Sequence, residues 1–239
     1  MELDKYSKKY IHYYPDQPPW LLLQLIENNS GAKAIADLGC GDGAILYALN
    51  KKRLLEHFDK VYAVDLSAER IEKVKRIDDR ISTLISDVCD LHQIQSNEID
   101  LIISNQIIEH VLDCELMIKE MSRILNNNGA VYLTTVFKKW YGWYFYKDKK
   151  GKWVIDPTHE REYTDDSQLL DLLKEHKLEI VENRKTLHWF ALTDFILKRI
   201  GFTRDIYEKS LFFRLLRRIK IPILGYYNWE IVCRKTAGH

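Results

Sequence analysis

Residues 34–43 read AIADLGCGDG, and this stretch decides the fold of the chain. A short apolar strand ends in an acid, three glycines follow at alternate positions, and the apolar residues 44–49 suit a helix. Glycine permits a positive φ and lets a ligand approach the backbone, and the amides at a helix N-terminus attract negative groups. The pattern therefore predicts a cofactor at the carboxyl end of the first strand of a parallel sheet. The residues expected to contact it are Asp37, Gly39, Gly41 and Gly43.

The acid before the first glycine narrows the kind of cofactor. A dinucleotide needs the amides of the turn for its pyrophosphate, and Asp37 adds little to that interaction. A ligand that carries an ammonium group can instead pair directly with the Asp37 carboxylate. Asp37 therefore favours a cofactor with a positively charged group.

The composition indicates one domain with a full hydrophobic core. The chain has 239 residues, 46% of them hydrophobic, and its net charge of +1 gives no positive field for a nucleic-acid partner. Its four cysteines lack the spacing of metal ligands, so we expect reduced thiols and no metal site. We see no signal peptide and no apolar run long enough to span a bilayer, and we expect a cytoplasmic protein. The cysteines are Cys40, Cys89, Cys114 and Cys233.

Strand-like and helix-like segments alternate along the chain, which predicts a parallel sheet with right-handed crossovers. The expected strands are 33–38, 61–65, 81–86, 99–104, 130–136, 178–186 and 228–235. The expected helices are 43–56, 67–77, 113–125 and 165–176. We expect Thr164 to cap the last of these helices and Gly129 to end the helix 113–125 in the left-handed conformation.

Two further strands also end in acids. Asp65 ends the second strand, where a carboxylate can accept hydrogen bonds from both hydroxyls of a ribose; alternatively, it caps the helix that begins near Ser67. Asp87 ends the third strand, where it can accept a hydrogen bond from an adenine amino group while the Val88 N–H donates to the ring. The alternative for Asp87 is a solvated loop acid. Three successive strands that end in acids indicate a cofactor site more strongly than the glycine turn alone.

With these residues the chain resembles the class I S-adenosylmethionine-dependent methyltransferases, in particular the type-11 group. The resemblance covers residues 30–136 well: residues 100–111 (DLIISNQIIEHV) look like the family's fourth motif, and residues 123–135 (RILNNNGAVYLTT) match the entry into its fifth strand. It implies S-adenosylmethionine as the cofactor. In that family the three acids lie near the methionine amino group, the ribose and the adenine amine, which correspond here to Asp37, Asp65 and Asp87. Leu66 and Val88 are the neighbouring residues expected to join these contacts.

The resemblance also implies an α/β Rossmann-like fold with the strand order 3-2-1-4-5-7-6 and an antiparallel last strand. We expect a single domain over residues 1–239, with a core of residues 31–187 and 228–239. Residues 1–30 would form an N-terminal lid, and residues 188–227 would form a helical cap inserted between the last two strands.

Polar residues just after the fourth strand are expected near the reacting methyl group. Asn105 and Gln106 face the cleft by the switch-point rule, unless they serve only to hold the loop by hydrogen bonds. The Glu-His pair that recurs in the family corresponds to Glu109 and His110. His110 is a candidate general base, and the alternative is that it holds the loop together.

The segment 156–163 (DPTHEREY) follows the fifth strand and is the second candidate for the acceptor side. It resembles the Asp-Pro-Thr-His loop of family members that act on small molecules, sugars or peptide ends. His159 is the leading candidate to deprotonate a hydroxyl acceptor, and Arg161 could bind an acceptor carboxylate or phosphate. The alternative is that both residues brace the loop against the edge of the sheet.

Two segments outside the βα rhythm have an unusual composition. Residues 139–146 (KWYGWYFY) are aromatic and, with Trp153, either wall the acceptor cleft or form a hairpin that closes the core. Residues 198–220 are basic and amphipathic. They either pack as a cap on the domain or make peripheral contact with an anionic membrane.

We therefore expect an S-adenosylmethionine-dependent methyltransferase that methylates an oxygen atom of a small molecule, a sugar or a peptide carboxylate. One rival function is an NAD-dependent oxidoreductase, because residues 39–44 fit the Gly-x-Gly-x-x-Ala pattern. The other is a cofactor-binding protein without catalysis.

Overall fold

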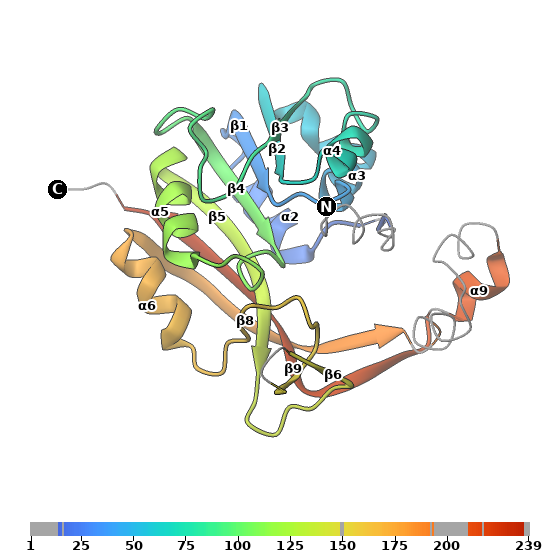
Figure 1. Cartoon of the computed structure of the whole chain (residues 1–239). Coiled ribbons are helices and arrows are strands. Elements are labelled where there is room, and N and C mark those ends of the chain that lie inside the picture. The colour runs from blue at the N-terminus through green and yellow to red at the C-terminus, as the bar shows by residue number, and fades with distance from the viewer. Residues whose placement is uncertain are drawn as a thin grey trace.

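The computed structural model describes residues 14–15, 17–148, 151–191, 193, 210–216 and 218–236. Its centre is a seven-stranded sheet in the order β3-β2-β1-β4-β5-β9-β8 (Figure 1). The strands are β1 Ala34–Leu38, β2 Lys60–Asp65, β3 Ile81–Ile85, β4 Ile99–Asn105, β5 Leu125–Lys138, β8 Leu178–Ala191 and β9 Lys220–Lys235. β9 is antiparallel to both of its neighbours, and the first five strands pair in parallel. The predicted fold class and strand order are confirmed, with β8 and β9 as the sixth and seventh strands of the prediction.

Helices cover both faces of the sheet. The helices α2 Trp20–Asn28, α3 Ala44–Lys51 and α4 Ala68–Val74 pack on one face, together with a 3₁₀ helix, Leu54–His57. The helices α5 Cys114–Ile124 and α6 Ser167–Glu175 pack on the other. A short hairpin, β6 Tyr146–Lys147 and β7 Trp153–Val154, and the short helix α9 Leu211–Leu216 complete the described elements.

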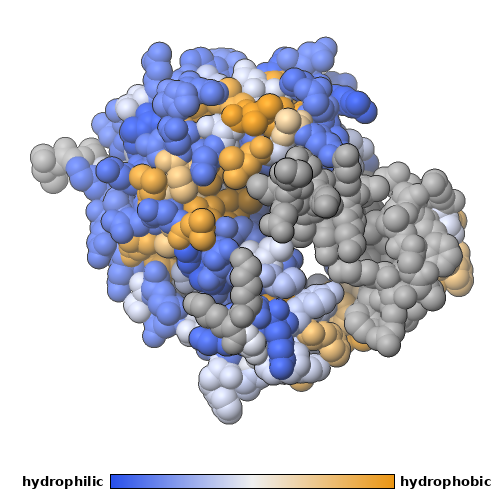
Figure 2. All heavy atoms as spheres, viewed as in Figure 1, coloured by the Kyte–Doolittle hydropathy of each residue, from blue (hydrophilic) through white to orange (hydrophobic). Residues whose placement is uncertain are grey.

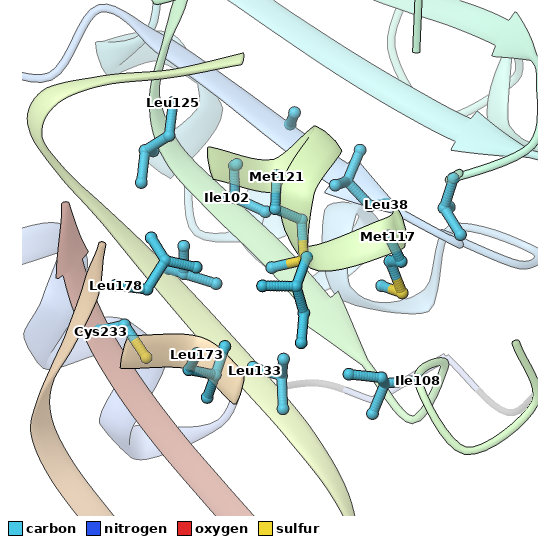
Figure 3. Packing of buried hydrophobic residues seen from close by; sticks show 14 of the residues in the cluster. Leu38, Ile102, Ile108, Met117, Met121, Leu125, Leu133, Leu173, Leu178 and Cys233 are labelled. Carbon is cyan, nitrogen blue, oxygen red and sulfur yellow. The ribbon is translucent and has the colours of Figure 1, made fainter. Parts of the chain in front are cut away.

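The core under α5 fixes the position of the loop that follows β4. Met117 and Met121 of α5 are fully buried and pack with Ile102 of β4 and Leu133 of β5 (Figure 3). Full burial of one such side chain contributes roughly 1.5–3 kcal/mol. The start of α5 is held as well, because the Asp113 carboxylate accepts the Leu116 N–H at 2.9 Å. The turn between β4 and α5 is therefore anchored at both ends.

Two predicted caps are wrong. Gly129 does not have a positive φ; Asn128, with φ +68°, makes that turn instead. Glycine is needed at 129 for space, since a Cβ there would lie 2.8 Å from the Leu125 side chain. Thr164 does not cap α6, which begins three residues later with Asp166 at its N-cap. The Thr164 N–H is instead bonded to the Gln168 side chain at 3.0 Å.

The last two strands are longer than predicted. β8 continues to Ala191 and β9 begins at Lys220, so both ends of the predicted cap 188–227 are strand. Alternation of apolar and polar residues in those stretches was masked by their many aromatics. β8 and β9 run on together beyond the rest of the sheet toward α9, and we call residues 187–191 and 219–226 the arm (Figure 1).

The predicted lid, cap and basic stretch are described only in part. Residues 1–13 and 16 of the lid, and residues 192 and 194–209, lie outside the described residues. The described part of the lid includes α2, whose Leu21, Leu22 and Leu25 are buried against the sheet. No helix in the described part of the chain is long and apolar enough to cross a membrane.

Candidate active site

The glycine turn after β1 is tied to the end of β2 by Asp65. One carboxylate oxygen of Asp65 accepts the Gly41 N–H and the other accepts the Ser67 N–H, both at 2.9 Å. Gly41 has φ +56°, and a Cβ on it would meet nothing closer than an Arg70 nitrogen at 3.7 Å. The backbone at Gly41 is therefore open to an approaching ligand. Ser67, not Asp65, caps α4, since its side chain accepts the Arg70 N–H.

Asp37 is a buried carboxyl group at the carboxyl end of β1. It is 2% exposed, and burial, followed by the nearby negative charge of Asp65, raises the pKa of Asp37 to about 7. A carboxylate with this pKa gains stability from any cation that enters its surroundings. Asp37 therefore has the property that a binding site for an ammonium group requires.

Apolar side chains are exposed at the same edge of the sheet. Leu66, which follows β2, is 53% exposed, and Ile85, which ends the adjacent β3, is 54% exposed. Asp87 lies just beyond them on the surface, with one carboxylate oxygen bonded to the Cys89 N–H at 2.9 Å, and Val88 is buried. Two apolar side chains beside an acid suit a flat heteroaromatic ring that carries an amino group.

The turn after β4 holds a buried carboxyl group, Glu109. It is fully buried and accepts a hydrogen bond from the Thr135 hydroxyl at 2.8 Å. Burial raises the pKa of Glu109 to about 7. Gln106 has a positive φ of +56°, and its amide nitrogen can donate to Glu109 at 3.1 Å. The side chain of Asn105 accepts the Thr134 hydroxyl at 2.8 Å, so both amide side chains help to hold this turn on β5.

His110 is held in one tautomer by Thr158. Its Nδ1 lies 3.3 Å from the Thr158 carbonyl oxygen and 3.2 Å from the Thr158 hydroxyl. The carbonyl can only accept, and the hydroxyl already donates to the Asp156 carboxylate at 2.7 Å. The neutral His110 ring therefore carries its proton on Nδ1 and leaves Nε2 as an acceptor. Burial, followed by the charge of His159, lowers the pKa of His110 below its usual value.

His159 lies against His110 and is backed by Glu162. The two imidazole rings meet edge to face with centroids 4.7 Å apart. The side chain of His159 is only 5% exposed, and its Nδ1 lies 3.4 Å from a Glu162 oxygen. Burial opposes the charged form of Glu162, but bonds from His159 and the Ile155 N–H, and the charge of Lys138, together lower its pKa. An ionised carboxylate thus faces Nδ1 of His159.

Arg161 braces the turn after β4. Its guanidinium donates to the carbonyl oxygens of Ile108, Val111 and Leu112 at 2.8, 2.5 and 2.7 Å. The backbone of the same loop adds a bond from the Glu160 N–H to the Glu109 carbonyl at 2.9 Å. Arg161 therefore braces the loop, as in the second of the two roles considered from the sequence. Through these bonds the turn after β4 and the loop 156–163 form one unit.

Glu109, His110 and His159 also offer the donor types of a metal site. One ligating atom of each lies within 4.8 Å of the others. Carboxylate and imidazole ligands suit a divalent transition metal, whereas the sequence analysis expected no metal site. The three side chains can bind either a proton or a cation at the same place.

Comparison with known proteins identifies the family. A family described as "Methyltransferase domain" matches residues 29–190, about two thirds of the chain. The chain belongs to that family. It is a class I S-adenosylmethionine-dependent methyltransferase by membership, and S-adenosylmethionine is the cofactor of the family. The rival assignment to NAD-dependent oxidoreductases is thereby set aside.

The curated relatives of this methyltransferase are distant. It is 26% identical over 160 residues to a ubiquinone biosynthesis O-methyltransferase of Pelagibacter ubique, covering 61% of each chain. It is 23% identical over 160 residues to the protein of that name in Bartonella quintana, covering 62% of this chain and 61% of the relative. The methyltransferase thus spans about three fifths of the length of these relatives.

Solved structures share the fold of the methyltransferase at low sequence identity. Geranyl diphosphate C-methyltransferase from Streptomyces coelicolor has a TM-score of 0.58 at 15% identity, covering 99% of this chain and 93% of that one. The [4+2]-cyclase SpnF has a TM-score of 0.63 at 16% identity, covering 96% and 89%. One fold carries both reaction types, so the acceptor and its chemistry must be argued from the site.

Most residues of this candidate site were predicted from the sequence, but the residues that support them were not. The structure brings the three acids and the glycine turn to one edge of the sheet, and it brings His110 and His159 together. Glu162, Thr158 and Thr135, which orient or bond the titratable groups, were not singled out. The i, i+3 spacing of His159 and Glu162 was visible, but in a loop this spacing implies no contact.

Proposed function

We propose that the methyltransferase binds S-adenosylmethionine at the edge formed by β1, β2 and β3. Asp37 would receive the ammonium group of the cofactor, and Gly41 would let the cofactor approach the backbone. Asp65 would accept the ribose hydroxyls, and Leu66 and Ile85 would cover the adenine. Asp87 and Val88 would bond the adenine edge, as the sequence predicts. The fit rests on a buried acid at the end of β1, whose ionised form a cation would stabilise, and on the open backbone at Gly41.

The proposed reaction is methyl transfer to a hydroxyl oxygen of a small molecule or a sugar. Bound S-adenosylmethionine supplies an electrophilic methyl group on a sulfonium. The chain must orient the acceptor oxygen in line with that methyl, exclude water and accept the hydroxyl proton. A hydroxyl acceptor needs a base because its oxygen is a weak nucleophile while it is protonated.

Nε2 of His110 is the proposed proton acceptor. The observation that carries this proposal is the contact of Nδ1 with the Thr158 carbonyl at 3.3 Å, which leaves Nε2 free of its proton. A pKa below the usual value keeps His110 neutral at pH 7. The side chain of His159, the leading candidate from the sequence, is only 5% exposed; His159 would position His110 and is held in turn by Glu162.

The contacts of Arg161 favour a hydroxyl over a peptide carboxylate as the proposed acceptor. Such an acceptor needs no base but needs a cation to orient it. The guanidinium of Arg161, the cation proposed from the sequence, is bonded to three backbone carbonyls. A hydroxyl acceptor, which needs a base such as His110, therefore fits the site better than a carboxylate, which needs an available cation.

The test is an acceptor screen with labelled cofactor. The full chain is incubated with S-adenosylmethionine carrying a labelled methyl group and panels of phenols, sugars and small carboxylic acids. We expect label on a hydroxyl oxygen, located by mass spectrometry and NMR. Label on a carboxylate, carbon or nitrogen atom would contradict the proposed acceptor class. Cofactor binding without transfer to any panel would favour the remaining rival, a binding protein without catalysis.

A chelator separates the two uses of the Glu109, His110 and His159 cluster. If the cluster binds only protons, turnover is unchanged after EDTA treatment and addition of Mg²⁺ or Zn²⁺. If it holds a metal, EDTA abolishes turnover and one of these ions restores it.

A further inference from the structure

The aromatic segment of residues 139–148 and 151–154, which contains the hairpin of β6 and β7, forms one continuous surface with the arm. The Lys139 N–H donates to the Gly225 carbonyl at 2.8 Å, which joins the start of the hairpin to β9. A Cβ on Gly225 would lie 2.4 Å from the Cα of Gly142, so the two backbones touch there. We call residues 139–148, 151–154, 189, 211–216 and 219–224 the arm surface. It lies at the end of the molecule where Figure 1 shows β6, β9 and α9.

The arm surface exposes most of the large apolar side chains that the described residues leave in solvent. Nineteen such side chains are exposed, and twelve of them lie here. Trp140 is 91% exposed and Leu224 is 71% exposed. The others are Tyr141, Trp143, Phe145, Trp153, Trp189, Leu211, Phe212, Leu215, Ile219 and Ile221. Pale and orange residues gather there, at the lower right of Figure 2. An exposed apolar surface of this extent marks an interaction site.

The side chains are of the kinds that insert at a lipid–water interface. Trp and Tyr are amphipathic and collect at the level of the headgroups, while Leu, Ile and Phe enter the acyl region. The aromatic side chains contact one another without being buried: Trp143 lies 4.9 Å from Phe145 and 5.5 Å from Trp153 between ring centroids. Lys147 lies over the Trp153 ring at 4.5 Å, so positive charge is mixed with the aromatic group.

Among the described residues, positive charge gathers at this end. Residues 138–148, 151–154, 210–216 and 218–224 together contain seven Lys or Arg and one acid, Asp148. The other described residues contain 19 Lys or Arg and 28 Asp or Glu. The first group therefore carries a net charge of +6 and the other described residues carry −9. Anionic lipid attracts such a cluster of basic residues.

We propose that the arm surface docks the methyltransferase on an anionic lipid bilayer. The basic side chains bring it to the headgroups, and Trp140, Leu224 and their neighbours enter the interface. Nucleic acid would use the positive charge but not the exposed Leu and Ile side chains, and a second copy of the chain would bring an equal positive charge against it. A bilayer complements both properties of the surface.

Vesicle co-sedimentation of the full chain tests the proposal without using turnover. The vesicles are pure phosphatidylcholine or phosphatidylcholine with about one third phosphatidylglycerol. We expect binding to the anionic vesicles at 0.1 M NaCl, binding at least about tenfold weaker at 0.5 M NaCl, and weak binding to the neutral vesicles. Because vesicle binding needs neither cofactor nor acceptor, it can fail independently of the proposed methyl transfer.

Matched variants separate the apolar and the electrostatic contributions to vesicle binding. Trp140→Ala with Leu224→Ala should weaken binding to anionic vesicles by about tenfold or more, since two exposed apolar anchors are lost. Lys147→Gln with Lys152→Gln should weaken it and reduce its salt dependence. Trp20→Ala is the control, because Trp20 is 60% exposed but lies on α2, outside the arm surface. Circular dichroism and thermal melts show that each variant is folded.

Three results would overturn the proposal. The first is no preference for anionic vesicles. The second is equal binding by the wild type and the Trp140→Ala, Leu224→Ala variant. The third is light scattering that shows a dimer which this variant dissociates, with no vesicle binding by the wild type, since a second copy would then be the partner of the arm surface.

Discussion

Glu162 and His159 face each other at 3.4 Å, carboxylate oxygen to Nδ1, in the loop that leads from β7 to α6. The same carboxyl group accepts the Ile155 N–H at 2.7 Å and the Tyr226 hydroxyl at 3.1 Å. Ile155 and Tyr226 thus orient Glu162, which faces the imidazole of His159, and His159 in turn contacts the ring of His110 edge to face. The site therefore has two adjacent imidazoles, and the ring of His159 supports that of His110.

His110→Ala should reduce turnover by roughly 10²–10⁴-fold, the usual contribution of a general base. Affinity for S-adenosylmethionine, measured by calorimetry, should change little, because the proposed role of His110 is to take a proton from the acceptor. For the wild type, kcat should rise with pH and level off below the ordinary imidazole pKa of about 6.5, since burial lowers the pKa of His110. His159→Ala serves as the comparison. A larger loss in His159→Ala than in His110→Ala would make His159 the base.

Binding of S-adenosylmethionine should become tighter as the pH rises through 7. The cofactor's ammonium requires an ionised Asp37, whose pKa is about 7 in the free protein. Below that value each pH unit should weaken binding by up to about tenfold, because the carboxyl group must first lose its proton. Calorimetry from pH 6 to 8 measures this. In Asp37→Asn the affinity should be lower and nearly independent of pH; a wild-type pH slope in that variant would refute the pairing of Asp37 with the cofactor.

Arg161→Lys should behave like Arg161→Ala, despite keeping the charge. A lysine ammonium cannot reproduce the planar fork that bonds the carbonyls of Ile108, Val111 and Leu112. We expect a lower melting temperature and a lower kcat in both variants, with a smaller change in the KM of the acceptor. An Arg161→Lys variant with normal turnover, or one that changes only the acceptor KM, would return Arg161 to acceptor binding.

Glu109→Gln should stabilise the protein at pH 8 and change its stability little at pH 5. Because burial raises the pKa of Glu109 to about 7, the native state holds a proton that the unfolded chain releases above about 4.5. Stability from this group is present below pH 4.5 and is lost as the pH rises to 7, by on the order of 3 kcal/mol. Gln keeps an acceptor for Thr135 without the buried charge. Urea unfolding at the two pH values measures the difference; a variant less stable than wild type at pH 8 contradicts it.

The strand order and the cofactor edge could be predicted because they depend on local patterns. A buried parallel strand that ends in an acid and a glycine turn is visible in ten residues, as in 34–43, and its register follows from the apolar run. Ser67 and Asp113, which cap α4 and α5, are likewise local signals. The features that could not be predicted depend on contacts between residues far apart in the sequence. The extension of β9 to Lys220 is specified by its partners in β8; for Lys220 itself the partner is Ala191, 29 positions earlier.

The support of the candidate site was hidden for the same reason. Thr135 bonds Glu109 across 26 positions, and Thr158 bonds His110 across 48. Threonines are common in strands and loops, so the sequence alone does not indicate that Thr135 or Thr158 bonds a residue of the site. From the sequence, Arg161 could equally brace its loop or bind an anionic acceptor. Only the three backbone carbonyls that its guanidinium contacts in the structure distinguish these roles.

The separation of charge among the described residues gives this part of the chain an electric dipole that the net charge of +1 conceals. Residues 138–148, 151–154, 210–216 and 218–224 carry +6, and the other described residues carry −9. Torque on such a dipole acts before any contact, so the protein would turn the arm surface toward a negative interface while it is still diffusing. Near neutral pH the arm surface would also hold the protein on a cation-exchange resin more strongly than a net charge of +1 implies.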